Sequence, residues 1–306
     1  MKRLLVALAV LALLGAGAFW ILTSPGLQAA GLEPVPAGAP NVENGRVAFH
    51  AGGCASCHAT PDQADRLKLG GGYPLRSPFG TFFVPNISPH PRDGIGAWTP
   101  AQFQRAMRGG VSPDGRHYYP SFPYTSYQRM TGEDSRDLLA YIMTLQPVEG
   151  RARDHELPFP FNVRRGLGLW KLAFLDGEPF RPDPAKSASV NRGAYLTRGL
   201  GHCAECHSGR NLAGAIDEER RYAGGPNPEG KGWVPNLTPD ATGLKEWTRG
   251  DVIEVLTSGL TPSGDSVGST MTSVVKNTAE IPEDDRRAIA EYLLQLPPKV
   301  GRKGPQ

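Results

Sequence analysis

All four cysteines of this 306-residue chain lie in two pentapeptides, Cys54-Ala55-Ser56-Cys57-His58 and Cys203-Ala204-Glu205-Cys206-His207. In each pentapeptide a histidine directly follows the second cysteine, which is the attachment motif for c-type haem. In this motif both thiols form thioether bonds to the haem, and the adjacent imidazole is placed to become the proximal iron ligand. Two copies therefore predict two covalent haems, held by Cys54, Cys57, Cys203 and Cys206, with His58 and His207 as iron ligands.

Two other uses of a Cys-x-x-Cys pair fit these motifs poorly. A disulfide of the thioredoxin type would need a surrounding βαβ pattern, and neither copy has one. A zinc site needs four ligands that converge tetrahedrally, and a histidine next to a cysteine in sequence is badly placed to share a metal with it. A second complete copy with no cysteine left over also argues against coincidence.

The two motifs belong to a longer internal repeat. Three other pairs recur at nearly the offset that separates the motifs: Val84 to Pro89 with Val234 to Pro239, Trp98-Thr99 with Trp247-Thr248, and Ala140-Tyr141 with Glu291-Tyr292. A duplication predicts one haem in each of two small domains. We place these domains at residues 42–147 and 188–298, joined by a connector at 148–187 and followed by a tail at 299–306.

The amino-terminal segment predicts export and membrane attachment. Lys2 and Arg3 precede an apolar run from Leu4 to Leu22, which is long enough to cross a bilayer as a helix. Residues 1–23 are therefore expected to anchor the chain with its amino terminus inside and the rest exported. The alternative is a signal peptide cleaved near Ala16-Gly17-Ala18. Residues 24–41, rich in Pro, Gly and Ala, are expected to form a flexible tether.

Periodicity and capping signals predict a mostly α-helical protein with long Gly/Pro loops. Three helices are expected in the first domain, with these landmarks: 45–50 as the first helix, Thr99 as the cap of the second with Gly109 just past its end, and Thr131 or Asp134 as the start of the third. The second domain repeats this plan. In the connector, apolar residues 167–174 predict a short helix packed across both domains, with a docking site for another protein as the alternative.

Each haem also needs a sixth ligand, and methionine or histidine is usual in electron-transfer cytochromes. Met271 follows a Gly/Ser/Thr loop before the last predicted helix and is the expected distal ligand of the second haem. By the repeat, the matching residue in the first domain is close to Phe122, which cannot bind iron. Met130 is the expected distal ligand of the first haem. His117 would give a bis-histidine haem instead, and the third possibility is that no protein ligand binds.

Charge and residue patterns argue against several functions. The formal net charge is +3, and Lys2 and Arg3 contribute two of these charges before the apolar run. The remaining arginines form no basic stripe with interleaved aromatic residues, so nucleic-acid binding is not expected. The sequence also has no recognisable Ser-His-Asp set, acid-base carboxylate pair or phosphate-binding glycine loop. Asn86 and Asn236, in the repeated stretch, are expected either to bond haem propionates or to support loops.

Further stretches form a specific pattern: Gly70–Pro74, Pro78–Thr81, Pro85–Pro89, His117–Pro120, Phe159–Asn162, Asn191–Tyr195 and Gly201–Cys203. With the two motifs, they resemble the membrane-bound cytochrome c subunits of bacterial periplasmic dehydrogenases. That family serves alcohol, aldehyde, gluconate and related molybdenum- or flavin-dependent enzymes. The similarity covers nearly the whole exported part. Many members carry three haems, whereas this chain has two motifs, and Phe122 replaces the usual methionine of the first domain.

The resemblance implies two tandem class I cytochrome c-like domains after an N-terminal transmembrane helix. It places the chain in the bacterial inner membrane with its haem domains in the periplasm. The implied function is transfer of single electrons from a periplasmic dehydrogenase to a quinone or a terminal oxidase. The alternative is a dihaem redox enzyme such as a peroxidase or a thiosulfate dehydrogenase; a peroxidase would need an open coordination site on one haem.

Overall fold

The structure, a computed structural model, describes residues 1–29, 31–228 and 232–301 and is mostly helical. The amino-terminal part contains α1 (Lys2–Leu22) and α2 (Pro25–Ala29), and the connector contains η1 (Arg164–Gly166) and α8 (Leu167–Phe174). The first half, residues 42–147, contains α3 (Val42–Ala51), α4 (Cys54–His58), β1 (Pro74–Ser77), β2 (Gly80–Phe83), α5 (Pro100–Gly109), α6 (Tyr124–Tyr127) and α7 (Gly132–Ile142). The second half, residues 188–298, contains α9 (Ala188–Tyr195), η2 (Leu196–Leu200), η3 (Cys203–Glu205), η4 (Glu218–Arg220), β3 (Gly225–Pro226), β4 (Trp233–Val234), α10 (Arg249–Ser258), α11 (Met271–Thr278) and α12 (Glu283–Leu293).

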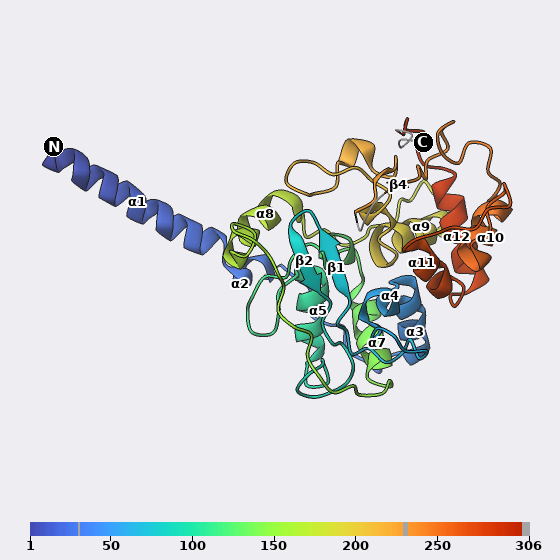
Figure 1. The fold of residues 1–306 in the computed structure, drawn as a ribbon, viewed down its shortest axis with the longest axis horizontal. Coiled ribbons are helices and arrows are strands. Elements are labelled where there is room, and N and C mark those ends of the chain that lie inside the picture. Colours follow the sequence, from blue (N-terminus) through green and yellow to red (C-terminus); the bar gives the residue numbers. More distant parts are fainter. Residues whose placement is uncertain (30, 229–231, 302–306) are drawn as a thin grey trace.

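The same helix crossing forms the centre of each half. In the first half α3 packs against α7, and in the second α9 packs against α12 (Figure 1). Each crossing is close because of a glycine. A Cβ built on Gly45 would lie 2.9 Å from the Cβ of Tyr141, and one built on Gly193 would lie 2.9 Å from the Cβ of Tyr292. Only glycine fits at these two positions, so the repeated sequence is also a repeated structure.

Most of the predicted helix boundaries agree with the structure. Thr99 caps α5 through a reciprocal capping box, but α5 includes Gly109 and ends at the left-handed Gly110 (φ +59°), one residue later than expected. Thr131, and not Asp134, caps α7, because its hydroxyl accepts a bond from the Asp134 amide at 3.0 Å. The strands form two short antiparallel pairs, β1 with β2 and β3 with β4.

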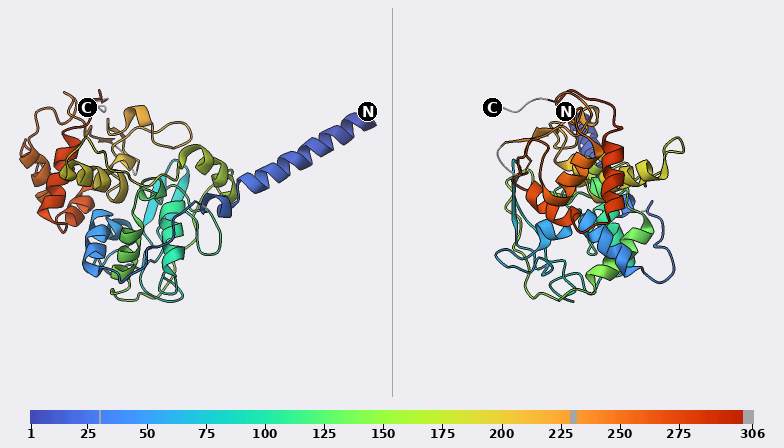
Figure 2. Two further views of the ribbon diagram at one scale, coloured as in Figure 1. Left: turned by 180° about the vertical axis from the view of Figure 1, so that it is seen from behind. Right: turned by 90° about the vertical axis from the view of Figure 1, so that its right-hand side faces the viewer.

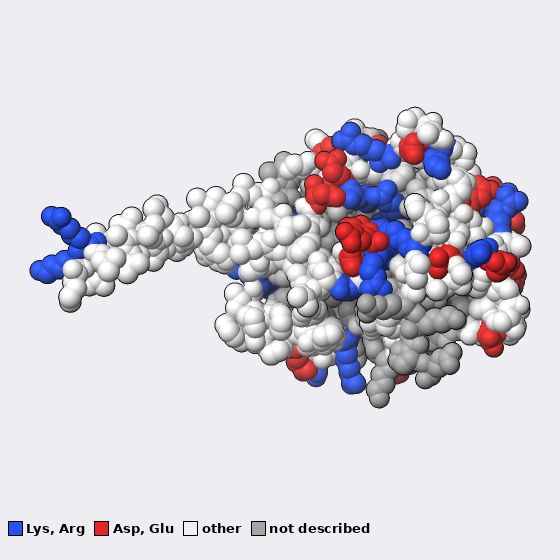
Figure 3. Space-filling model, turned by 90° about the horizontal axis from the view of Figure 1, so that it is seen from above, with Lys and Arg blue, Asp and Glu red and all other residues white. Residues whose placement is uncertain are grey.

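The helix α1 projects from the side of the first half, as Figures 1 and 2 show. It is long and apolar enough to cross a membrane, and it is the one such helix among the described residues. None of its residues is buried by the rest of the protein. In Figure 3 its body is free of charged side chains, and basic residues lie only at its tip. A signal sequence shares these properties, so the finding fits both predictions for this segment.

The segment that follows α1 differs from the predicted flexible tether. Residues 25–29 form α2, and the stretch after Ala30 lies along the first half. Gln104 donates to the Glu33 carbonyl, and the guanidinium of Arg136 donates to the carbonyls of Pro36 and Ala37. These bonds hold the stretch against α5 and α7. It differs from a free linker because its backbone carbonyls find donors on helices far away in sequence.

The connector helix α8 contacts both halves. Lys171 is 1% exposed, and its Nζ donates to the carbonyl oxygens of Gly109 and Gly110 at 2.8 and 2.6 Å. A basic group at this place bonds to carbonyls at the end of α5, where no further helical turn supplies amide donors. Trp170, which directly precedes Lys171, donates from its Nε1 to the Ala213 carbonyl of the second half at 2.9 Å. The connector therefore forms the predicted helix in contact with both halves, but through Lys171 and Trp170, while its apolar side chains Leu169, Leu172 and Phe174 are exposed.

Replacing Gly45 or Gly193 with alanine should destabilise the affected half by about 1–3 kcal/mol, the usual cost of overpacking. In an open helix the same change stabilises by roughly 1 kcal/mol, because alanine is the better helix former. The midpoint temperature of thermal unfolding should therefore fall if the helices cross closely and rise if they do not. Gly166→Ala is the matched control, because its Cβ would meet no atom within 4 Å. Stabilisation by Gly45→Ala would contradict the crossing geometry.

Candidate functional site

The first Cys-x-x-Cys-His motif forms one helical turn, α4, which begins after Gly53 in a left-handed conformation (φ +59°). His58 Nδ1 lies 2.8 Å from the carbonyl oxygen of Pro85. A carbonyl only accepts hydrogen bonds, so this contact assigns the proton to Nδ1 and leaves the lone pair on Nε2. Nε2 is then the ring nitrogen available to a metal, and a bond of this kind commonly orients histidine ligands.

The second motif has the same arrangement. His207 Nδ1 lies 2.8 Å from the carbonyl oxygen of Pro235. Pro85 and Pro235 occupy corresponding places in the repeated Val-Pro-Asn stretch, so each copy of the repeat supplies one carbonyl to one histidine. The sequence repeat identified the Val-Pro-Asn stretch but did not show that its proline carbonyl accepts a bond from the histidine. The signal in the sequence was that this stretch follows each Cys-x-x-Cys-His motif at nearly the same distance.

Asn86 and Asn236, which follow these prolines, support the loops. Asn86 Nδ2 donates to the carbonyls of Val148 and Gly150 at 2.7 and 2.8 Å. Asn236 Nδ2 donates to the Lys299 carbonyl at 2.7 Å. In both cases the side-chain oxygen accepts a bond from the backbone amide two residues further on. Of the two predicted roles, loop support is the one these contacts favour, since both amide hydrogens of Asn86 bond backbone.

Burial shifts the pKa values of cysteines and histidines in both motifs. Burial raises the pKa of Cys54 to about 12 and that of Cys203 to about 11, and no disulfide joins either cysteine pair. His58 is partly exposed, but its ring is closely surrounded, and burial lowers its pKa to about 4 against the effect of the Pro85 bond. Burial lowers the pKa of His207 as well. Neutral imidazoles can donate a lone pair to iron.

The donor set does not resemble a zinc site. Within the described ranges, no group of three or more His, Cys, Asp or Glu side chains converges as metal ligands. A haem site needs less from the side chains, because its ring supplies four equatorial nitrogens and the protein supplies axial ligands. One oriented imidazole directly after a pair of cysteines, found twice, fits that requirement.

The residues just before the two motifs contact each other. His202 Nε2 lies 3.2 Å from the carbonyl oxygen of Gly52, and the Tyr127 hydroxyl donates to the same oxygen at 3.3 Å. The rings of Tyr127 and His202 pack edge to face with centroids 5.6 Å apart. Gly52 lies two residues before Cys54, and His202 directly precedes Cys203. The two attachment motifs are therefore neighbours in space.

A residue inside the first motif bonds to the second half. The Ser56 hydroxyl accepts a bond from Asn277 Nδ2 at 2.8 Å and donates to the Ser273 carbonyl at 3.3 Å. Both partners lie on α11, the helix that begins at Met271. The first attachment motif is thus tied to the segment that carries the expected distal ligand of the second haem.

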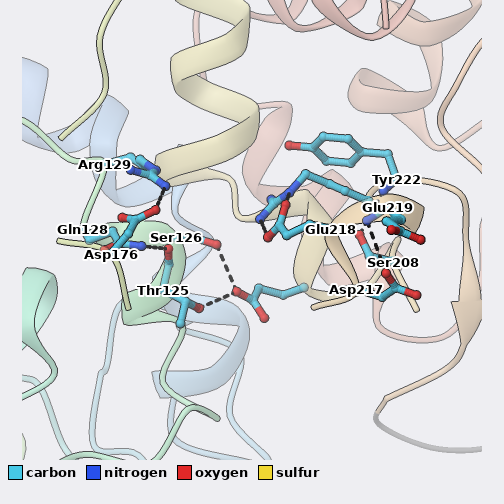
Figure 4. Close-up of polar contacts among 12 residues, drawn as sticks. Thr125, Ser126, Gln128, Arg129, Asp176, Ser208, Asp217, Glu218, Glu219 and Tyr222 are labelled. Atoms are coloured by element: carbon cyan, nitrogen blue, oxygen red, sulfur yellow. Dashed lines mark hydrogen bonds and ion pairs between the residues drawn. The ribbon is translucent and has the colours of Figure 1, made fainter. Parts of the chain in front are cut away.

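The corresponding residue of the second motif makes the reciprocal contact. Glu205 accepts bonds from the hydroxyls of Thr125 and Ser126 on α6 at 2.8 and 3.0 Å; Figure 4 draws both contacts. Arg210 pairs with its other oxygen at 2.7 Å. Burial opposes the charge of Glu205, but Arg210 and the Thr125 hydroxyl outweigh it, so its pKa is lowered. Ser56 and Glu205 are variable positions of the motif, which is why no sequence pattern signals this role.

The candidate distal ligands lie in different surroundings. Met271, at the start of α11, is partly buried and packs against the hydrophobic core. Met130 is 0% exposed within that core. His117 is also buried, and its Nε2 lies 2.8 Å from the carbonyl oxygen of Thr23 at the end of α1. Ligation by Met271 and by Met130 remains a prediction.

Glu205→Gln keeps the size of the side chain and removes its charge. We expect it to lower the free energy of unfolding by about 1.5–3 kcal/mol, the range for hydrogen bonds to charged groups, because Arg210 loses its counter-charge. Glu178→Gln is the control, because Glu178 pairs with Arg181 between two exposed side chains. Exposed pairs of this kind contribute about 0–1 kcal/mol. Equal losses in the two variants would contradict a stabilising role of Glu205 at the interface.

Comparison with known proteins identifies the family. Residues 42–146 match the family model for cytochrome c. The chain is 48% identical over 300 residues to a "diheme cytochrome c-type" protein of Cereibacter sphaeroides, covering 97% of this chain and 99% of that protein. It is 36% identical over 285 residues to the fructose dehydrogenase cytochrome subunit of Gluconobacter japonicus, covering 92% of this chain but 58% of that subunit.

A third relative has a different layout. A nicotinate dehydrogenase subunit of Pseudomonas putida is 41% identical over 256 residues, which cover 83% of this chain and 21% of that protein. The chain thus spans nearly all of the first relative but only part of the dehydrogenase subunits. The match over almost the whole length of a dihaem protein, together with two oriented histidines beside paired thiols, shows covalently bound haem c. The chain belongs to the c-type cytochrome family that includes the cytochrome c subunits of bacterial dehydrogenases.

Proposed function

We propose that the two halves are tandem class I cytochrome c-like domains, each holding one haem. Cys54 and Cys57 attach the first haem and Cys203 and Cys206 the second, with His58 and His207 as proximal ligands. The observation that carries this proposal is the pair of matching bonds from histidine Nδ1 to a proline carbonyl, both at 2.8 Å. Met271 is the distal ligand of the second haem, since it is partly buried at the start of α11, directly after the Gly/Ser/Thr loop.

The function is single-electron transfer from a periplasmic dehydrogenase, molybdenum- or flavin-dependent, to a quinone or a terminal oxidase. The relatives named as subunits of dehydrogenases support this donor class. Haem c supplies a reversible one-electron change at its iron. The protein contributes a fixed orientation of each imidazole and a rigid junction between the motifs. The contact of Gly52 with His202 supports a short route between the two sites.

A dihaem redox enzyme, such as a peroxidase or a thiosulfate dehydrogenase, is the second candidate function. One observation favours it: Phe122 occupies the place in the first half that Met271 occupies in the second. A peroxidase needs an open coordination position, and a methionine-ligated haem has none.

The location follows from the amino terminus and the surface beside it. We place α1 in the bacterial inner membrane as an anchor, with both halves in the periplasm. Arg165 donates to the hydroxyl of Thr23 at 2.9 Å, and α8 contacts α2, so the connector lies at the base of α1 (Figure 1). Large apolar side chains of this connector are exposed: Phe159, Phe161, Val163, Leu169, Leu172 and Phe174. An apolar surface beside a spanning helix suits contact with lipid.

The haem proposal predicts the mass and redox behaviour of the purified protein. The mature chain should carry two haems that survive acidic extraction, and a redox titration should give two one-electron steps. Cys57→Ala and Cys206→Ala should each remove stable double attachment at one site, because one thioether bond is lost. Ser208→Ala, close to the second motif but without a thiol, should keep both haems. A single haem in correctly matured wild type would refute the two-domain assignment.

The anchor proposal predicts that the full chain resists carbonate extraction from membranes. The intact mass of the mature protein should include Met1 or Lys2, because a retained anchor is not cleaved. Recovery of a soluble form that begins after Ala18 or Ala30 would instead establish a cleaved signal peptide.

A further inference from the structure

We propose that a cavity on the second half binds a small oxyanion such as inorganic phosphate. The cavity has a volume of about 140 Å³ and is lined by residues of η2, by the loop that carries Tyr222, by α12 and by the stretch that follows α12. Its lining includes three basic residues, Arg198, Arg221 and Lys299, and two tyrosines, Tyr222 and Tyr292. No residue of either attachment motif belongs to this lining.

The three cations share a single carboxylate. The guanidinium of Arg221 forms a forked pair with Glu218, with nitrogen–oxygen distances of 2.6 and 2.5 Å, and Lys299 Nζ donates to the Glu218 carbonyl at 3.1 Å. The hydrogen bond from Arg221 is the main cause that lowers the pKa of Glu218, and the positive charges of Arg198 and Lys299 add to it. All three basic groups therefore lie near one carboxylate, and the described lining of the cavity contains no other acidic side chain.

Arg198 is the cation that is available to a ligand. It is exposed at the cavity, and its guanidinium forms no hydrogen bond or ion pair with a described residue. Burial raises the pKa of Tyr222 and of Tyr292, and the positive charges of Arg198 and Arg221 oppose this rise. Both guanidiniums thus act on both tyrosines. Since a planar guanidinium can bond to two oxygens of one anion, a pair of them at one cavity favours an oxyanion.

The cavity also contains a buried donor without a partner. Tyr222 is 2% exposed, and its hydroxyl makes no hydrogen bond in the described structure, as Figure 4 also shows. The Tyr292 hydroxyl lies near it without hydrogen-bonding geometry, and the Arg221 Cζ lies 5.8 Å from the centroid of the Tyr222 ring. A guanidinium only donates hydrogen bonds, so it cannot satisfy the hydroxyl proton. An anion oxygen in the cavity would supply the missing acceptor, and a buried hydroxyl is costly without one.

The first half has apolar residues at two of these places. Leu69 holds the place of Tyr222, since its carbonyl accepts the same bond from the residue after the loop asparagine, at 3.0 Å against 2.8 Å. Val148 holds the place of Lys299, since the side chain of the loop asparagine donates to each of these carbonyls at 2.7 Å. The repeated fold therefore needs neither a hydroxyl nor a cation here, and their presence together in the second half indicates a separate role.

The site adjoins the loop that orients His207. Gly224, two residues after Tyr222, donates from its amide to the His207 carbonyl at 2.9 Å. If the second haem is attached as proposed, a negative charge bound at this cavity favours its ferric form and lowers its reduction potential. The apolar side chains of Leu296 and Pro297 complete the lining and strengthen these electrostatic interactions by excluding water. The cavity has room for a small ion together with water.

The test is calorimetric titration of the full-length protein in maltoside detergent with inorganic phosphate, at constant ionic strength set with chloride. The wild type should bind one phosphate per chain. Arg198→Gln and Tyr222→Phe should each weaken binding by about tenfold or more, because each removes a hydrogen bond to a charged ligand. Lys245→Gln is the matched control, because Lys245 is an exposed cation of the same half outside the cavity, and it should change binding by less than about twofold. In a redox titration, phosphate should lower one of the two potentials in the wild type and neither in Tyr222→Phe.

Absence of binding at millimolar phosphate would overturn the proposal, and so would an equal loss in Lys245→Gln, which would reveal general attraction to positive charge. Binding that leaves both potentials unchanged would refute the placement beside the second haem. Weaker phosphate binding in phosphatidylglycerol nanodiscs than in detergent would support the site and identify a lipid headgroup as the source of its anion. A wild type with a single attached haem would contradict the proposed function instead; the mass reveals it, and the calorimetry reports on the cavity independently of it.

Discussion

The hydrogen bond from an imidazole Nδ1 to a proline carbonyl is the interaction on which each half depends. It fixes the tautomer of His58 and of His207 and directs the free nitrogen of the ring. The proline carbonyl is itself held, because the next residue, Asn86 or Asn236, ties the loop to backbone near the end of its half. The imidazole, the proline carbonyl and the asparagine side chain thus belong to one connected network, as metal ligands commonly require.

The interface joins two such networks without metal or disulfide links between them in the described structure. Ser56 and Glu205 reach across in opposite directions, and Gly52 accepts bonds from residues of both halves. The halves nevertheless differ at this junction. The contact from the first half is made by the neutral hydroxyl of Ser56. The contact from the second half is made by the buried carboxylate of Glu205, which pairs with Arg210. The duplication kept the geometry and changed its electrostatics, so the two haem environments are not equivalent.

Local patterns predicted much of this molecule. The attachment motifs, the Thr99 cap and the apolar run of α1 each depend on residues a few positions apart, so the sequence displays them directly. The bond from Gln104 to Glu33 spans 71 positions, and that from Asn277 to Ser56 spans 221. No local pattern reports such partners, which is why the docked tether and the reciprocal interface contacts were not foreseen.

The ligand of the first haem, predicted as Met130, shows the same limit at the site. A methionine just before a helix is chemically able to bind iron, and sequence alone does not tell whether it faces a cofactor or the core. In the structure Met130 is buried just before Thr131, the cap of α7, and Ile281 holds the corresponding place before α12. Phe122, by contrast, keeps the same register in sequence and structure, because no insertion interrupts the chain between the β-bridge from Val111 to His117 and this residue.

The reciprocal contacts of Ser56 and Glu205 also constrain the order of events during maturation. Both residues lie between the cysteines proposed to attach haem, and each bonds to a helix of the opposite half. Each helix narrows the approach to cysteines that are only partly exposed. Docking of the two halves therefore restricts the approach to the proposed attachment sites, and attachment before docking meets the least obstruction.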